Sequence, residues 1–308
     1  MPDLRWDERN IPDLSGKVAL VTGGNGGVGF ETVKLLAQRG ARVIMASRSE
    51  ERGQAAKKLL LAQGITGKID VLPLELGSLA SIRALGEKVN QRYDRLDYLI
   101  NNAGIMMCPY GTTEDGFERQ MGVNHLGHFA LTGRLLSLME ASGEARIITL
   151  SSRRHVDDAL TFPDIYHTSA NYSPIKAYGR SKLANLLFAY ELDRRLREAG
   201  KKVRSLAAHP GRANTNIGTY LFGNPVMSFL KRPMLAIMSQ PARISALSPV
   251  RAAVDPGASG GECFAPSLRD HKHGYPSRAI THERSYDRET AIRLWERSED
   301  LTGVRYSL

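Results

Sequence analysis

The chain has little cysteine and no long uninterrupted hydrophobic run. Only two cysteines occur among 308 residues, Cys108 and Cys263, and they lie far apart in the sequence. Their spacing excludes a disulfide framework and a clustered zinc site, and it predicts a reducing compartment. The longest apolar stretch, residues 220–239, is broken by glycine, proline, lysine and arginine. It therefore falls short of the roughly 20 apolar residues of a membrane-spanning helix.

An apolar signal region is also missing from residues 1–10, where charges are mixed with a proline. A secretory signal needs a continuous apolar core. We therefore expect a cytoplasmic protein whose contact with a membrane is at most peripheral. One alternative remains open, a peripheral membrane enzyme whose residues 220–239 dip into lipid.

The excess of positive charge is moderate. Lysine and arginine total 42 against 32 aspartates and glutamates, for a formal net charge of +10. Hydrophobic residues make up 42% and charged residues 24%, which excludes collagen-like, disordered and coiled-coil classes. Aromatic residues are not interleaved with the basic ones, so we expect no nucleic-acid partner. The basic run at residues 194–204 mostly ends a predicted helix, where cations complement the helix dipole.

Short β-branched or leucine-rich runs alternate with longer segments of helical periodicity. This alternation predicts an α/β protein, a doubly wound parallel sheet of about seven strands. We expect one domain over residues 15–308, preceded by an N-terminal extension at residues 1–14. One helix should run from about Gly27 to just before Gly40, and another from about Ile175 to Ala199. The expected strands are Val18–Thr22, Arg42–Ala46, Ile69–Pro73, Leu96–Ile100, Ala145–Leu150, Val203–Ala207 and Glu262–Phe264.

A glycine-rich turn joins the first expected strand to the first helix. Six of the eight residues 22–29 are Gly or Asn, more than a merely flexible turn needs. Residues without a Cβ let backbone N–H groups at a helix N-terminus approach a pyrophosphate. Two spacings fit the motif: Gly24, Gly26 and Gly29, or Gly23, Gly27 and Gly29.

The end of the second expected strand indicates which dinucleotide binds. An NAD site usually places an acidic residue there, which accepts hydrogen bonds from the ribose hydroxyls. Here the strand ends with Ser47 and Arg48. A guanidinium suits a 2′-phosphate, so the sequence favours NADP, with NAD as the alternative.

Tyr178 and Lys182 are four residues apart on a predicted helix and therefore share a face. Such a pair alone is weak evidence. Other polar or turn-forming motifs follow the carboxyl ends of successive strands, where open α/β sheets bind ligands. These motifs are Asn101-Asn102-Ala103-Gly104, Val123-Asn124-His125, Ser151-Ser152 and Pro210-Gly211.

This ordered set, over about residues 15–305, resembles the short-chain dehydrogenase/reductase family. Residues 115–118, 124–129, 181–185 and 209–211 resemble its retinol-dehydrogenase-like and WW-domain oxidoreductase-like branch. The resemblance implies a single Rossmann-type domain, a three-layer sandwich, that binds a nicotinamide cofactor. It further implies hydride exchange between that cofactor and an alcohol or carbonyl carbon.

The resemblance assigns catalytic roles to Asn124, Ser152, Tyr178 and Lys182. Tyr178 is expected to be the general acid and base, because an adjacent ammonium and a positively charged nicotinamide lower the pKa of a phenol from about 10. Ser152 rather than Ser151 should stabilise the reacting oxygen. By the family pattern, Lys182 also bonds the nicotinamide ribose, and Asn124 helps to hold Lys182 and a water.

The resemblance also assigns cofactor contacts along the chain. Glu75 departs from the pattern, because relatives often place an aspartate beside the adenine. The full expected set is Gly23, Asn25, Gly27, Val28, Gly29, Ser47, Arg48, Glu75, Leu76, Asn102, Ala103, Gly104, Tyr178, Lys182, Pro210, Gly211 and Thr215.

Substrate identity is only loosely constrained. Apolar residues around 212–240 stand where family members build a substrate lid, so we expect an apolar carbonyl or alcohol substrate. His125 and His128 lack a third ligand at helical spacing, so we expect no metal. The resemblance allows a homo-oligomer. The alternative function is a cofactor-bound regulatory or scaffolding protein with little turnover.

Overall fold

The computed structural model describes residues 5–211, 240–268 and 271–308. They form an eight-stranded sheet in the order β3-β2-β1-β4-β5-β6-β7-β8. Strands β1 to β7 are parallel, and β8 runs antiparallel beside β7. The strands are β1 (Val18–Thr22), β2 (Arg42–Ser47), β3 (Ile69–Pro73), β4 (Tyr98–Asn101), β5 (Arg146–Leu150), β6 (Arg204–Ala208), β7 (Cys263–Leu268) and β8 (His273–Arg278).

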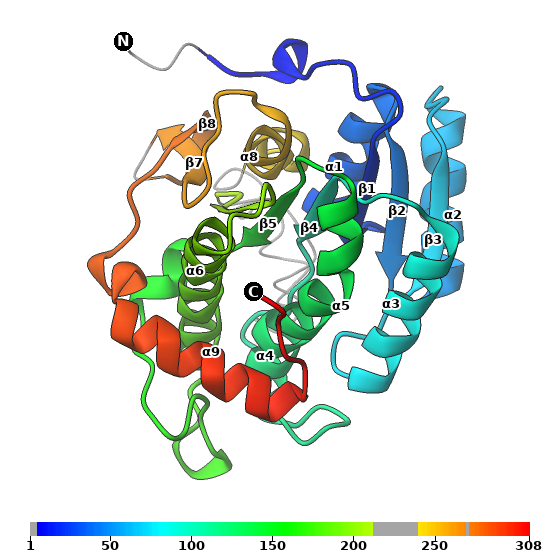
Figure 1. Cartoon of the computed structure of the whole chain (residues 1–308). Coiled ribbons are helices and arrows are strands. Elements are labelled where there is room, and N and C mark those ends of the chain that lie inside the picture. The colour runs from blue at the N-terminus through cyan, green and yellow to red at the C-terminus, as the bar shows by residue number, and fades with distance from the viewer. Residues whose placement is uncertain (1–4, 212–239, 269–270) are drawn as a thin grey trace, which may run out of the picture.

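Helices cover both faces of the sheet, which makes three layers (Figure 1). One buried cluster joins the sheet to α1, α2 and α8, and a second joins its other face to α3, α5 and α6, with α9 packed against α6. The expected Rossmann-type α/β fold is therefore confirmed. The helices are α1 (Gly27–Gln38), α2 (Glu50–Ala62), α3 (Leu79–Arg92), α4 (Arg119–Met121), α5 (Gly127–Ala141), α6 (Pro174–Glu198), α8 (Ala242–Val254) and α9 (Arg288–Thr302).

The central strands are hydrophobic along their whole length because both of their faces are covered. All five residues of β1 are buried, and Leu20 pairs with Ile44 of β2 on one side and Leu99 of β4 on the other. Such continuous apolar runs are typical of buried parallel strands. The chain adds strands to one side of β1 up to β3 and to the other side from β4 onward. A crevice is therefore expected beyond the carboxyl ends of β1 and β4, where the strand order changes direction.

The segment before β1 packs against the domain. Trp6, Ile11 and Leu14 are buried in the same cluster as α1 and α8. Residues 5–14 of the expected extension therefore contribute to the core. The expected lid around 212–240 lies outside the described residues except for Gln240, and Thr215 lies outside them as well.

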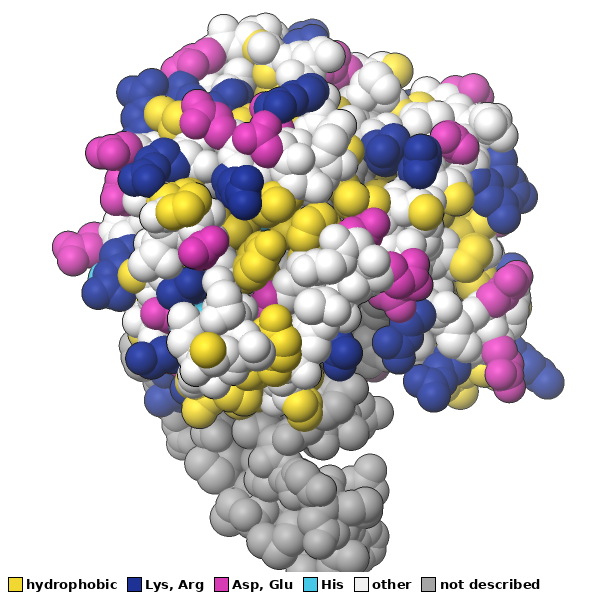
Figure 2. Space-filling view, turned by 90° about the horizontal axis from the view of Figure 1, so that it is seen from below, with side chains coloured by type: hydrophobic (Ala, Val, Ile, Leu, Met, Phe, Trp, Pro, Cys, Tyr) yellow, Lys and Arg dark blue, Asp and Glu magenta, His cyan; other side chains and the backbone are white. Residues whose placement is uncertain are grey.

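Charges are mixed on the face that Figure 2 shows. Lysine and arginine side chains stand among aspartate and glutamate side chains there, around a group of hydrophobic ones. Within the described ranges, none of the helices combines the length and the hydrophobicity that a membrane span requires.

Candidate active site

The glycine-rich turn between β1 and α1 has the conformation of the second predicted spacing. Gly23 and Gly27 have φ values of 65° and 54°, a region that favours glycine. A Cβ on Gly29 would lie 2.3 Å from the Gly23 carbonyl oxygen and 2.5 Å from Asn102 Nδ2. A Cβ on Gly26 would meet nothing within 4 Å. Positions 23, 27 and 29 therefore need glycine, and position 26 does not.

The first turn of α1 is suited to an anion. Its N-cap residue, Gly26, makes no side-chain capping hydrogen bond, so the helix-terminal N–H groups have no side-chain acceptor. Val28 is buried, whereas Asn25 at the tip is partly exposed. A glycine cradle followed by an uncapped helix N-terminus fits the pyrophosphate of a dinucleotide.

Thr22 fixes the loop after β4 against this turn. Its hydroxyl oxygen accepts hydrogen bonds from the backbone N–H groups of Asn102 and Ala103, both at 2.9 Å. Asn102 Nδ2 donates back to the Thr22 carbonyl at 2.7 Å. Two predicted cofactor segments, one after β1 and one after β4, are thus joined directly.

His128 connects the Thr22 hydroxyl to the backbone of Asn124. Its Nδ1 lies 3.0 Å from the Asn124 carbonyl oxygen, and its Nε2 lies 2.9 Å from Thr22 Oγ1. The carbonyl can only accept, so we assign the proton to Nδ1, and Nε2 then accepts from the hydroxyl. Burial lowers the pKa of His128 to about 4, which keeps the ring neutral. Sequence reasoning missed this role, because the two contacts of the histidine are far apart in the chain.

Arg48 and Glu75 face each other at the ends of β2 and β3. Arg48 Nε lies 3.9 Å from Glu75 Oε2, and the Arg48 side chain is 75% exposed. An exposed pair at this distance contributes little to stability, so Arg48 is available to another anion. The neighbouring Ser47 is buried and donates to the Ser49 carbonyl, and Leu76 is buried next to Glu75.

Tyr178 lies in α6 with its phenol near the Ser152 side chain. Ser152 follows the end of β5, and its hydroxyl is near enough to the phenol to influence the pKa of Tyr178. Burial raises the pKa of Tyr178 to about 12, although the Ser152 hydroxyl and the Arg154 charge both act to lower it. The expected lowering of the phenol pKa depends on a positively charged nicotinamide as well as on Lys182, so it stays a prediction; in the chain alone the effect of burial is larger.

Lys182 lies one turn further along α6 and is also buried. Its Nζ is 5.8 Å from the centre of the Tyr178 ring and donates to the Leu150 carbonyl at 3.1 Å. Burial lowers the pKa of Lys182 to about 8. Ser151 instead donates to the Lys182 backbone carbonyl at 2.8 Å. The two serines are thus distinguished, since the Ser151 hydroxyl is engaged by the backbone of α6, whereas the Ser152 hydroxyl influences the pKa of the Tyr178 phenol.

Asn124 lies in a single π-helical turn, Gly122–Leu126, between α4 and α5. Its Oδ1 accepts from the Ile105 N–H at 2.9 Å, and its Nδ2 donates to Ser181 Oγ at 2.9 Å and to the Ile105 carbonyl at 3.0 Å. A Cβ on Gly104 would lie 3.1 Å from Asn124 Oδ1 and 3.4 Å from Lys182 Nζ. The asparagine, the lysine and the loop after β4 therefore converge.

A cavity of about 280 Å³ adjoins Ser152. Its wall includes Val156, Leu186 and Ile280 as well as several polar side chains. Beyond β6, Gly211 has a φ of 74°, and the Pro210 carbonyl accepts a hydrogen bond from Gln240 Nε2 at 3.1 Å.

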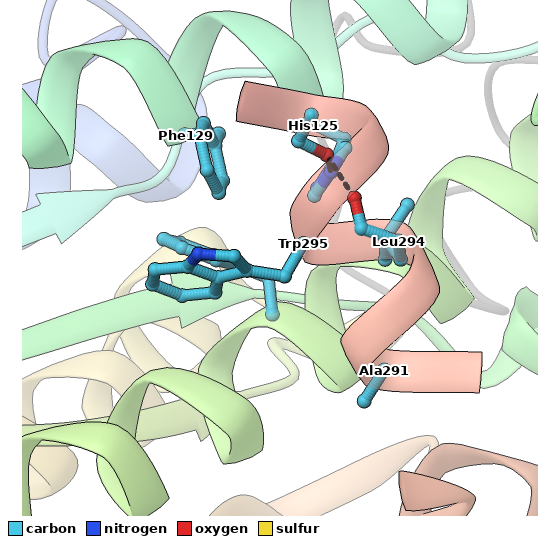
Figure 3. Close-up of a pocket in the computed structure, with 7 residues that line it drawn as sticks. His125, Phe129, Ala291, Leu294 and Trp295 are labelled. Carbon is cyan, nitrogen blue, oxygen red and sulfur yellow. Dashed lines mark hydrogen bonds between the residues drawn. The ribbon is translucent and has the colours of Figure 1, made fainter. Parts of the chain in front are cut away.

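His125 has a structural role away from this cavity. It packs with Phe129 and Trp295, and its Nε2 lies 2.9 Å from Ser298 Oγ of α9 (Figure 3). Burial lowers the pKa of His125 to about 3. The two histidines of this segment thus bond to side chains of different elements, His125 to α9 and His128 to the end of β1.

The sequence was compared with known families and proteins. Residues 17–224 match the family described as short chain dehydrogenase. The chain belongs to this family. Retinol dehydrogenase 13 of Homo sapiens is 39% identical over 293 residues, which cover 94% of this short-chain dehydrogenase and 86% of that protein. Retinol dehydrogenase 14 of Mus musculus is 37% identical over 94% of this chain and 87% of its own length.

Solved structures agree with this assignment. An uncharacterized protein from Mycobacterium paratuberculosis superposes with a TM-score of 0.82 at 37% identity, covering 99% of this chain and all of that one. The Pseudomonas aeruginosa RhlG/NADP complex superposes with a TM-score of 0.63 at 27% identity, covering 82% and 94%. This short-chain dehydrogenase is therefore an oxidoreductase of the retinol-dehydrogenase-like branch that acts on CH–OH groups of small molecules.

Proposed function

We propose that the protein is an NADP-dependent oxidoreductase in which Tyr178 is the general acid and base. The observation that carries the proposal is that the buried Tyr178 phenol lies near the Ser152 side chain, with Lys182 Nζ 5.8 Å from the Tyr178 ring and a cavity beside Ser152. A bound nicotinamide supplies or accepts the hydride in this chemistry.

Each side chain has a distinct task in the proposed reaction. Tyr178 gives its phenolic proton to a carbonyl oxygen during reduction and takes it back during oxidation. Ser152 donates a hydrogen bond to the same oxygen and stabilises the charge that develops there. Lys182 places a positive charge near the phenol, and Asn124 holds the loop after β4 against it.

Tyr178→Phe tests the assignment. The variant lacks the transferable proton but keeps the ring, so we expect kcat/KM with aldehydes to fall by about a hundredfold or more. NADPH affinity, measured by fluorescence titration, should change little. Normal turnover by this variant would refute the role of Tyr178. A wild-type protein that binds NADPH but reduces no aldehyde or ketone would favour the regulatory alternative.

The preference for NADP rests on Arg48. Its exposed guanidinium ends β2, where a 2′-phosphate would lie, and the RhlG relative was solved with NADP. We expect Arg48→Ala to weaken NADPH binding by about tenfold and to leave NADH binding nearly unchanged, because only NADPH carries that phosphate. Equal losses for both nucleotides, or tighter NADH binding by the wild type, would contradict the preference.

The substrate is proposed to occupy the cavity beside Ser152. Apolar side chains of Val156, Leu186 and Ile280 on its wall favour a substrate with substantial hydrocarbon surface. Several relatives carry the name retinol dehydrogenase, which is consistent with an apolar alcohol or aldehyde.

A further inference from the structure

Among the described residues that line the cavity beside Ser152, one has a buried side-chain nitrogen without a hydrogen-bond partner. Four histidines line it, from the segment after β5, the end of β6 and the segments that flank β8. Their hydrogen bonds show what each ring can offer to a ligand. The four are His155, His209, His271 and His282.

The other three histidines of the wall each have at least one ring nitrogen in a hydrogen bond, and His282 Nδ1 accepts from the Arg284 N–H at 3.2 Å. His155 Nδ1 lies 2.7 Å from the Ser152 carbonyl, and its Nε2 accepts from the His282 N–H at 3.1 Å. His271 Nδ1 lies 2.9 Å from the Pro266 carbonyl. Both nitrogens of His155 are therefore engaged, and the ring holds the segment that carries Ser152.

His209 differs from them because its second ring nitrogen is buried without a partner among the described residues. Its Nδ1 accepts a hydrogen bond from the Gly211 N–H at 2.8 Å, so the proton of the neutral ring belongs on Nε2. The residue is only 8% exposed, and Nε2 is buried without a hydrogen-bond partner in the part of the chain that the structure describes. Burial is the main cause that lowers the pKa of His209 to about 3, with smaller contributions from the nearby His271, His155 and Arg153. The ring is therefore a neutral donor near pH 7.

An unpaired buried N–H is unfavourable in the free protein, and a ligand that supplies an acceptor removes that cost. We propose that His209 Nε2 donates a hydrogen bond to a second oxygen of the substrate, separate from the oxygen that reacts. This inference rests on the proposed function, because it takes the cavity to be the substrate site. It names the substrate class more closely: a largely apolar aldehyde, ketone or alcohol that also carries a neutral acceptor such as an ether, hydroxyl or carbonyl oxygen.

The cavity position favours the substrate over the cofactor as the source of this oxygen. The described residues of the wall include none from the glycine-rich turn and none from the end of β2. A neutral donor also suits an uncharged oxygen better than a phosphate, which is usually bound by cations or helix N-termini.

An oxygen scan tests the proposal. The probes are decanal and a series of analogues in which each chain methylene beyond the one next to the aldehyde is in turn replaced by an ether oxygen of nearly the same size. We expect one analogue, or two neighbouring ones, to exceed decanal in kcat/KM by about tenfold with NADPH. The dissociation constants of the same compounds, measured by calorimetry with NADPH present, should show the same maximum.

Two variants serve as a matched pair. In His209→Asn, the amide Oδ1 can still accept from the Gly211 N–H, but the donor at the Nε2 position is lost. The kcat/KM of the preferred analogue should therefore fall to that of decanal. His209→Gln keeps an N–H near the Nε2 position and should retain most of the preference. If His209→Asn instead bound NADPH more weakly and kept the same preference among the analogues, His209 Nε2 would donate to the cofactor, and the proposal would be overturned.

The scan separates this inference from the proposed function. The wild-type protein could show no turnover and still bind one analogue most tightly, with that preference lost in His209→Asn. This result would refute the oxidoreductase proposal and support the role of His209 Nε2 as a donor. Normal turnover with no analogue preferred over decanal would refute the donor and leave the oxidoreductase proposal intact.

Discussion

Burial of Lys182 lowers the free energy of unfolding of the protein. Burial lowers its pKa to about 8, below the ordinary 10.5. The unfolded chain thus binds the lysine proton more tightly than the folded protein does. Stability is consequently lowest where the lysine is charged in both states, and it rises as pH increases from about 8 to about 10.5.

We predict that Lys182→Met raises the free energy of unfolding by about 3 kcal/mol near pH 7 while abolishing turnover. The Leu150 carbonyl keeps a donor in the variant, because Asn185 Nδ2 lies 2.8 Å from it. Urea unfolding near pH 7 and near pH 10 measures the effect, and the gain should largely vanish at the higher pH. Lys176→Met, at an exposed site of the same helix, is the control. A variant less stable than wild type at both pH values would contradict the prediction.

Single residues of the site were predictable where chemistry and order along the chain suffice. Side-chain type and helical spacing, together with the motifs after the strands, predict Tyr178 and Lys182, whereas only the family pattern favours Ser152 over Ser151. The link from His128 to Thr22 was not predictable, since it joins residues 106 positions apart. The unpaired Nε2 of His209 depends on a hydrogen bond at the other ring nitrogen, which no sequence pattern specifies.

Among the elements, the start of α1 shows why glycine is needed at one position and not at its neighbour. An alanine inside a helix usually gains about 0.5–1 kcal/mol over glycine. At Gly29, however, a Cβ would lie 2.3 Å from the Gly23 carbonyl oxygen, and a backbone atom cannot move aside cheaply.

Gly29→Ala is therefore expected to destabilise the protein by about 2 kcal/mol and to weaken NADPH binding. Gly26→Ala is the control for stability, because its Cβ would meet nothing within 4 Å and its φ of −164° is accessible to any residue. Thermal unfolding of the two variants should separate them clearly. Equal melting temperatures would show that the turn relaxes around the methyl group.

The strands differ in how far the sequence defines them. β1 is hydrophobic throughout, and its predicted bounds are those observed. β8 was not predicted, because its sequence HGYPSR has no alternation and contains glycine and proline. It forms because an edge strand tolerates proline, and Pro276 pairs with Pro266 of β7 there. Tertiary context, rather than local propensity, specifies this strand.

At the scale of the whole molecule, the two tryptophans report on opposite faces of one sheet. Trp6 belongs to the cluster under α1 and α8, whereas Trp295 packs with Phe129 and Phe188 on the other face. Both faces share the same strands, so neither cluster should persist without the other.

We predict that the fluorescence transitions of Trp6→Phe and Trp295→Phe, each with one remaining tryptophan, coincide with the far-UV circular dichroism transition of the same variant in urea. Each variant is its own reference, so a shift in stability does not affect the comparison. A fluorescence midpoint well below that of the circular dichroism would reveal a face that unfolds independently.

The packing of residues 5–14 also bears on synthesis. Trp6 lies beside the guanidinium of Arg251, and Glu8 pairs with Arg243, both in α8. The ribosome translates α8 long after residues 5–14 have emerged. The Trp6 indole therefore lacks these native contacts during most of elongation. The nascent polypeptide must carry this apolar segment exposed, and it is there that we expect a chaperone to bind the emerging chain.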